Sequence, residues 1–143
     1  MTTYRRAAML SALLGLAVTA AASDQKLSDT LKGVMENHVR AYDAQDTDGV
    51  LRTMHTQSPA YEPTRAVLAQ QLRSGGLGVT LVDFHYMGHD SEFAVARVRM
   101  KTLGPPGSNF VGNVTDNIML FHQEGGVWKL WGDDVLGVQF TSR

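Results

Sequence analysis

The chain has no cysteine among its 143 residues, which excludes disulfides, zinc–thiolate sites and thiol nucleophiles. Charged residues make up only 19%, and Lys and Arg nowhere form a block. The sequence therefore lacks the basic surface that concentrates a protein on phosphate backbones, and nucleic acid is not expected as a partner. Serine-centred nucleophile elbows, Walker loops and dinucleotide-binding glycine fingerprints are also missing, so we expect no cofactor.

Long apolar runs are missing too, except near the start. Arg5 and Arg6 precede residues 7–22, which are mostly small and apolar and end at Ala22-Ser23. This pattern predicts a signal peptide over residues 1–22, removed after Ala22 by a Sec or twin-arginine route. A transmembrane helix needs about 20 apolar residues, and this run is shorter. We therefore expect a periplasmic or secreted domain over residues 23–143 that leaves the membrane after cleavage; the alternative is a buried N-terminal helix.

The first half of this domain has the periodicity of helices. Apolar residues from Leu27 to Tyr42 recur in steps of three and four, which predicts one amphipathic helix. A second, shorter helix is predicted to begin at Asp46, whose side chain can cap it. Pro63 suits a first helical turn, so a third helix is expected over Thr64–Arg73.

After Gly76 the period changes from 3.6 to 2. Strands are expected over Val79–Tyr86, Glu92–Lys101, Phe110–His122 and Val127–Asp134, joined by Gly-rich turns. Residues 137–140 can extend the last strand. Three helices followed by four hairpin-linked strands predict an α+β fold with a curved antiparallel sheet packed on the helices.

Three segments of the second half carry a family resemblance. Residues 88–95, the Phe110–Asn113 segment and the Gly125–Leu130 segment resemble the strands of the nuclear transport factor 2-like (NTF2-like) superfamily, in its SnoaL-like and uncharacterised bacterial branch. The resemblance implies a cone-shaped domain with a pocket between the helices and the concave face of the sheet. That superfamily contains both enzymes and modules that only bind, so the fold does not decide the function.

The last two strands supply the candidate carboxylates. With a three-residue turn over Glu124–Gly126, Asp116 would lie opposite Asp134. Two opposed carboxylates in an apolar pocket raise the pKa of one of them, which suits general acid–base catalysis. A two-residue turn would break this pair, and a frayed strand would leave both acids at the solvated rim.

His38 and Tyr42 lie one turn apart on the apolar face of the first helix, so either they reach into the pocket or they are ordinary core residues.

We predict binding of a small apolar molecule. The alternatives are an isomerase or dehydratase that uses Asp116 with Tyr42 or His38, and a dimeric interaction module with a filled cavity. His85 and His89 lack a third ligand, so no metal site is expected. The predicted ligand-binding residues are Val39, Tyr42, Tyr61, Leu68, Ile118, Leu120, Trp128 and Asp134.

One face of the second strand is expected to be convex and basic. Arg97, Arg99 and Lys101 alternate there with inward-facing apolar residues, beside Phe93 and Val95. A basic row of this kind is usually a solvated face that discourages edge pairing. Because the two apolar residues need cover, a homodimer is the partner that we expect at this face.

Overall fold

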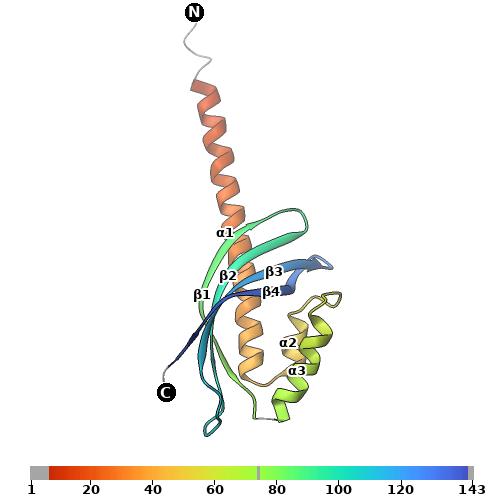
Figure 1. Cartoon of the computed structure of the whole chain (residues 1–143). Helices are drawn as coiled ribbons and strands as arrows, with labels where there is room; N and C mark the ends of the chain where they lie inside the picture. The colour runs from red at the N-terminus through yellow and green to blue at the C-terminus, as the bar shows by residue number, and fades with distance from the viewer. Residues whose placement is uncertain (1–6, 74, 142–143) are drawn as a thin grey trace, which may run out of the picture.

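A computed structural model describes residues 7–73 and 75–141 of the chain (Figure 1). Three helices come first, followed by one antiparallel sheet with the strand order β1-β2-β3-β4, as predicted. The sheet curves around the second half of the first helix (Figure 1). The elements are α1 (Ala7–Asp43), α2 (Thr47–Arg52), α3 (Tyr61–Arg73), β1 (Gly78–His89), β2 (Phe93–Leu103), β3 (Asn113–Glu124) and β4 (Val127–Phe140).

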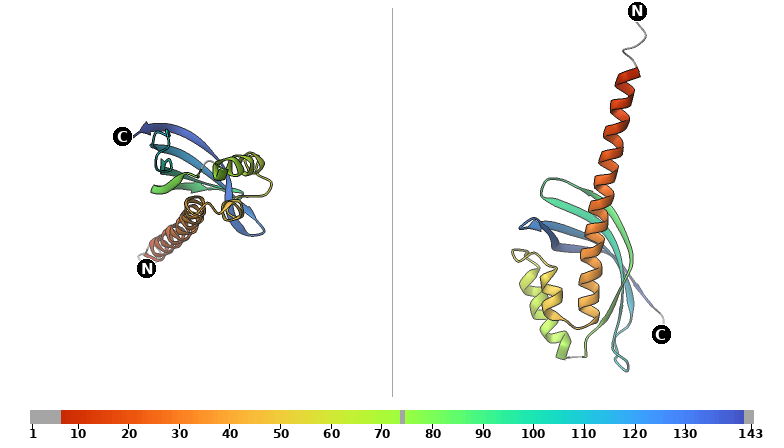
Figure 2. Two further views of the ribbon diagram at one scale, coloured as in Figure 1. Left: turned by 90° about the horizontal axis from the view of Figure 1, so that it is seen from below. Right: turned by 180° about the vertical axis from the view of Figure 1, so that it is seen from behind.

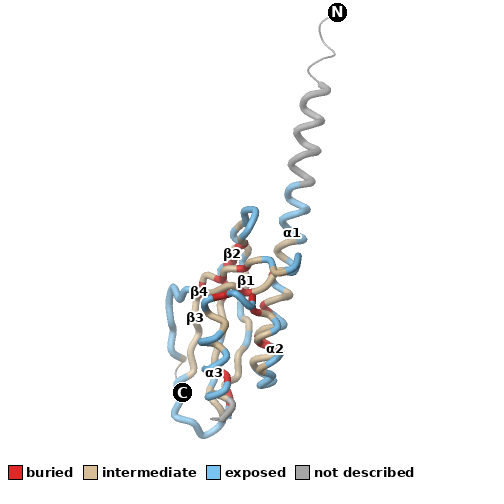
Figure 3. The backbone as a smooth tube through the Cα atoms, turned by 90° about the vertical axis from the view of Figure 1, so that its right-hand side faces the viewer, coloured by how far each residue is buried: buried red, intermediate tan, exposed pale blue. Residues whose placement is uncertain are grey.

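The core forms where α1 meets the concave face of the sheet, and Figure 3 shows the buried residues gathered there. Leu31 and Met35 on α1 are completely buried and belong to the same cluster as three small residues of β2. Burying a side chain of this size stabilises the fold by roughly 1.5–3 kcal/mol. These three residues are Ala94, Ala96 and Val98, while the backbone of α1 comes closest to β1 and β4.

The first half of α1 projects away from the domain (Figures 1 and 2). The helix is continuous from Ala7 to Asp43, and residues 20–26 are exposed. Residues 1–6 of the predicted signal peptide lie outside the described residues. Within the described part of the chain, no helix is both long and apolar enough to cross a membrane. Cleavage and export stay predictions.

The connection between α2 and α3 is attached to the edge of β4. The N–H of His55 donates to the carbonyl of Leu130 at 2.8 Å, and the N–H of Leu130 donates to the carbonyl of Thr53 at 2.9 Å. The hydroxyl of Ser58 donates to the carbonyl of Trp131. These bonds pair part of the edge of β4 and fix the position at which α3 begins. Asp46 caps α2 as predicted, because its carboxylate accepts from the N–H of Gly49 at 2.8 Å.

The turn between β3 and β4 has two residues, Gly125 and Gly126, with φ values of 59° and 81°. Positive φ at both central positions is typical of the two-residue turns that match strand twist. Glu124 therefore pairs with Val127, and the predicted three-residue turn is wrong.

The pairing predicted between two carboxylates is wrong as well. β4 carries two bulges opposite β3, and they shift the pairing further along the strands. Ile118 consequently pairs with Asp134, and Asp116 pairs with Gly137.

Candidate functional site

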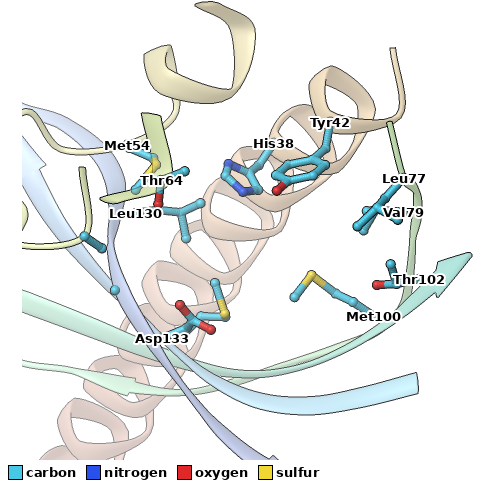
Figure 4. A pocket seen from close by; sticks show the side chains of 13 residues that line it. His38, Tyr42, Met54, Thr64, Leu77, Val79, Met100, Thr102, Leu130 and Asp133 are labelled. Carbon is cyan, nitrogen blue, oxygen red and sulfur yellow. The ribbon is translucent and has the colours of Figure 1, made fainter. Parts of the chain in front are cut away.

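A cavity of about 280 Å³ lies between α1, the start of α3 and the concave face of the sheet (Figure 4). Most of its lining is apolar, with methionines from the α2–α3 connection, β2 and β3. Five polar side chains complete it. The described lining residues are His38, Tyr42, Met54, Ala60, Thr64, Leu77, Val79, Met100, Thr102, Met119, Leu130, Gly132 and Asp133.

His38 reaches the cavity from α1 with one ring nitrogen already bonded. Its Nδ1 lies 2.7 Å from the hydroxyl oxygen of Thr53, and that hydroxyl donates to the carbonyl of Val50 at 2.6 Å. Because the single proton of Thr53 is used on Val50, we assign the ring proton of His38 to Nδ1. Nε2 then carries a lone pair, and it has no partner among the described side chains. Burial lowers the pKa of His38 to about 4, so the ring is neutral near pH 7.

Tyr42 lies one turn further along α1, with its ring centroid 6.0 Å from that of His38. Its hydroxyl donates to the side-chain carbonyl of Gln71 on α3 at 2.7 Å. Burial raises the pKa of Tyr42, while the bond to Gln71 works in the opposite direction. The hydroxyl is thus protonated, with its proton directed at Gln71, and it can still accept a hydrogen bond from a ligand.

Asp133 stands on the sheet side of the cavity, with its carboxyl group directed inward (Figure 4), and it pairs with Met119 of β3. Burial raises the pKa of Asp133, and the neighbouring carboxylate of Asp134 raises it further. Among the described residues that line the cavity, Asp133 is the only one with a formal charge near pH 7. The residue as a whole is exposed, so water reaches its carboxylate.

The sequence-predicted carboxylate, Asp116, lies on the other face of the sheet. Its oxygen Oδ1 accepts from Nε of Arg97 at 2.9 Å, and a second bond joins Oδ2 to the same guanidinium. Hydrogen bonding to Arg97 lowers the pKa of Asp116. An ionised, paired carboxylate on the convex face cannot exchange protons with a molecule in the cavity, so Asp116 is not part of this site.

The remaining predicted residues divide by the face they occupy. Val39 is buried in the core, Leu68 is buried between α1, α2 and α3, and neither lines the cavity. Tyr61 and Trp128 are half-buried and pack on the core cluster. Three others are on the convex face with Asp116, because β3 alternates and the pairing is shifted: Ile118, Leu120 and Asp134.

Sequence reasoning missed the methionines and Asp133. Met100 and Thr102 follow the same alternation in β2 as the core alanines, so that pattern was sufficient to place them on the concave face. Asp133 required the bulge to be recognised, and Gly132 beside it is the available signal, since a glycine inside a strand often marks a bulge.

Comparison with solved structures identifies the fold class of the chain. It is similar to an NTF2-like protein of unknown function from Pseudomonas putida KT2440, with a TM-score of 0.64, 12% identity, and coverage of 78% of this chain and 86% of that one. A ketosteroid isomerase-like protein from Erwinia carotovora atroseptica SCRI1043 has a TM-score of 0.56, 9% identity, and coverage of 77% and 96%. Bdellovibrio bacteriovorus Bd1075 has a TM-score of 0.60 and 12% identity; 73% of this chain covers 39% of that one. These likenesses show an NTF2-like fold.

The family follows from the sequence. Residues 33–141, about three quarters of the chain, match the family described as the C-terminal domain of the anti-sigma-I factor RsgI9, and the chain belongs to that family. No curated protein matches it.

Proposed function

We propose that the protein binds a small, mostly apolar molecule in the cavity between α1 and the sheet. The cavity of about 280 Å³ carries the proposal, because an unfilled space of this size with an apolar lining is what a small-ligand site requires. A small number of polar groups line the cavity, as in ligand sites where such groups orient the bound molecule. The open cavity also argues against a module filled by its own side chains.

An uncharged fluorescent probe tests this proposal. Prodan, a naphthalene ketone whose emission shifts to the blue in apolar surroundings, should bind the wild-type protein with saturation. Met100→Trp should weaken that binding at least tenfold, because Met100 points into the cavity (Figure 4) and a larger side chain would fill the space. Met87→Trp is the matched control, since Met87 is 56% exposed and lies outside the cavity. Equal binding by both variants would contradict the proposal.

A second candidate is an isomerase-type enzyme that uses Asp133 for proton transfer. The raised pKa of Asp133 and the likeness to a ketosteroid isomerase-like protein favour it. Such chemistry also needs a donor for the oxygen that becomes negative. His38 directs its proton to Thr53 and Tyr42 directs its proton to Gln71, so binding is the better-supported function.

The enzyme candidate has its own test. Conversion of 3-cyclohexenone to 2-cyclohexenone, followed by ultraviolet absorbance, should proceed at the buffer rate with wild type and with Asp133→Asn alike. Acceleration by the wild type that Asp133→Asn abolishes would establish the enzyme instead. We further propose that the domain is exported, and that two copies meet across the convex face of the sheet.

A further inference from the structure

The cavity presents hydrogen-bond acceptors to whatever enters it. Nε2 of His38 has a free lone pair that can accept a hydrogen bond, because the ring proton is on Nδ1 and points toward Thr53. While it is ionised, the carboxylate of Asp133 can accept hydrogen bonds but cannot donate them. The oxygen of Tyr42 accepts as well, since its proton points at Gln71.

The remaining polar groups do not reverse this balance. The hydroxyls of Thr64 and Thr102 can donate or accept, so they adapt to either kind of ligand. The methionine sulfurs are weak acceptors and never donate. No Lys or Arg is among the described residues that line the cavity.

The charge of the cavity has one sign. Asp133 lines it, Asp134 follows in the chain, and His38 is neutral near pH 7. An anionic ligand would meet a carboxylate with no cation among the described lining residues, and a ketone or ester would depend on Thr64 or Thr102 for a hydrogen-bond donor. A cation would pair with this carboxylate, and the mostly apolar lining makes their attraction stronger than it would be in open water.

Resting on the proposed function, we propose that the ligand is a small apolar amine bound as its ammonium ion, which donates to the carboxylate of Asp133. Its hydrocarbon part occupies the space between Met100 and Met119, and Nε2 of His38 accepts a further hydrogen bond from the ligand. A bound ammonium ion also supplies the cation that none of the described lining residues offers to Asp133.

Three naphthalene probes of similar size and different charge test the proposal: 1-naphthylmethylamine, 1-naphthylmethanol and 1-naphthoate. Isothermal titration calorimetry near neutral pH measures their dissociation constants for the full chain. The amine should bind at least tenfold more tightly than the alcohol, and the carboxylate should bind most weakly. Asp133→Asn should remove the advantage of the amine and leave the alcohol within threefold of wild type.

Asp134→Asn is the matched control for charge. Asp134 is the next residue, but it pairs with Ile118 on the convex face, so the amine should keep its affinity within threefold. Equal affinities of the wild type for the amine and the alcohol would overturn the inference and leave the proposed function intact. If none of the three probes binds, this inference fails, and the Prodan titration decides separately whether the proposed function fails with it.

A measurement on the wild type covers the case in which Asp133→Asn does not fold. The titratable groups that line the cavity with Asp133 are His38 and Tyr42 of α1, while the described lining residues of β2 and α3 do not titrate. The next residue, Asp134, lies on the convex face and raises the pKa of Asp133 through its charge. Amine binding should weaken as the pH is lowered through the raised pKa of Asp133, because protonation removes the negative charge that the ammonium ion contacts. Alcohol binding should stay constant over the same range. An amine affinity that does not change with pH would contradict the inference.

Discussion

Phe121 is the residue at which the packing of this fold can be tested most directly. Its side chain is completely buried, and it lies on the concave face of β3 between Ala94 of β2 and Leu130 of β4. Truncating a core Phe to Ala costs about 3–5 kcal/mol, and the cost is larger where the surroundings cannot collapse into the space. Ladders on both sides of Phe121 fix the backbone, and Ala94 is too small to fill the gap. We therefore expect a loss of about 4 kcal/mol.

That loss of stability corresponds to a measurable decrease in melting temperature. A domain of about 120 residues has an unfolding entropy near 0.25 kcal/mol per kelvin, so about 4 kcal/mol lowers Tm by about 16 °C. Urea unfolding followed by circular dichroism gives the free energy and the m-value. Phe140→Ala is the matched control, because Phe140 is 72% exposed and its loss should change stability by less than about 0.5 kcal/mol. A loss below about 1 kcal/mol for Phe121→Ala, or equal losses in the two variants, would refute the packing described here.

Three further predictions concern single residues. Hydrogen bonds from Lys129 and Thr56 lower the pKa of Glu124 to about 2, so the stability it adds is complete above its usual pKa and is lost as the pH falls toward 2. In urea titrations the deficit of Glu124→Gln should thus shrink with acidification; a deficit independent of pH would contradict this. Gly33→Ala should stabilise α1 by about 0.5–1 kcal/mol in thermal unfolding, since a methyl group there meets no atom within 4 Å, and a lower Tm would disprove it. Asp116→Asn should leave the Prodan affinity within twofold of wild type, and a larger loss would show that Asp116 belongs to the binding site.

The order and type of the elements could be predicted from the sequence because local patterns determine them. The steps of three and four from Leu27 to Tyr42 fall within α1, and the alternation from Ala94 to Met100 gives the concave face of β2. His38 and Tyr42 both line the cavity because a helix sets the direction of residues one turn apart. The hydrogen bonds that determine where their protons point come from Thr53 and Gln71, and this long-range information is absent from local periodicity.

The boundary of α1 shows another limit of local patterns. The amphipathic pattern begins at Leu27, whereas the helix is continuous from Ala7, because small apolar residues favour a helix without requiring a buried face. A segment can therefore be helical in the full chain and still have the composition of a signal peptide.

A single extra residue in β4 decides which carboxylate the cavity receives. With the two-residue turn and no bulge, Met119 would pair with Gly132, and Asp134 would stand on the concave face opposite Asn117. The bulge at Trp131 shifts the pairing by one, so that Asp133 pairs with Met119 and Asp134 turns to the convex face with Ile118. Both candidates are aspartates, so composition cannot distinguish them. The chemistry of the site thus depends on backbone pairing, and the unpaired residue at Trp131 determines which of the two aspartates reaches the cavity.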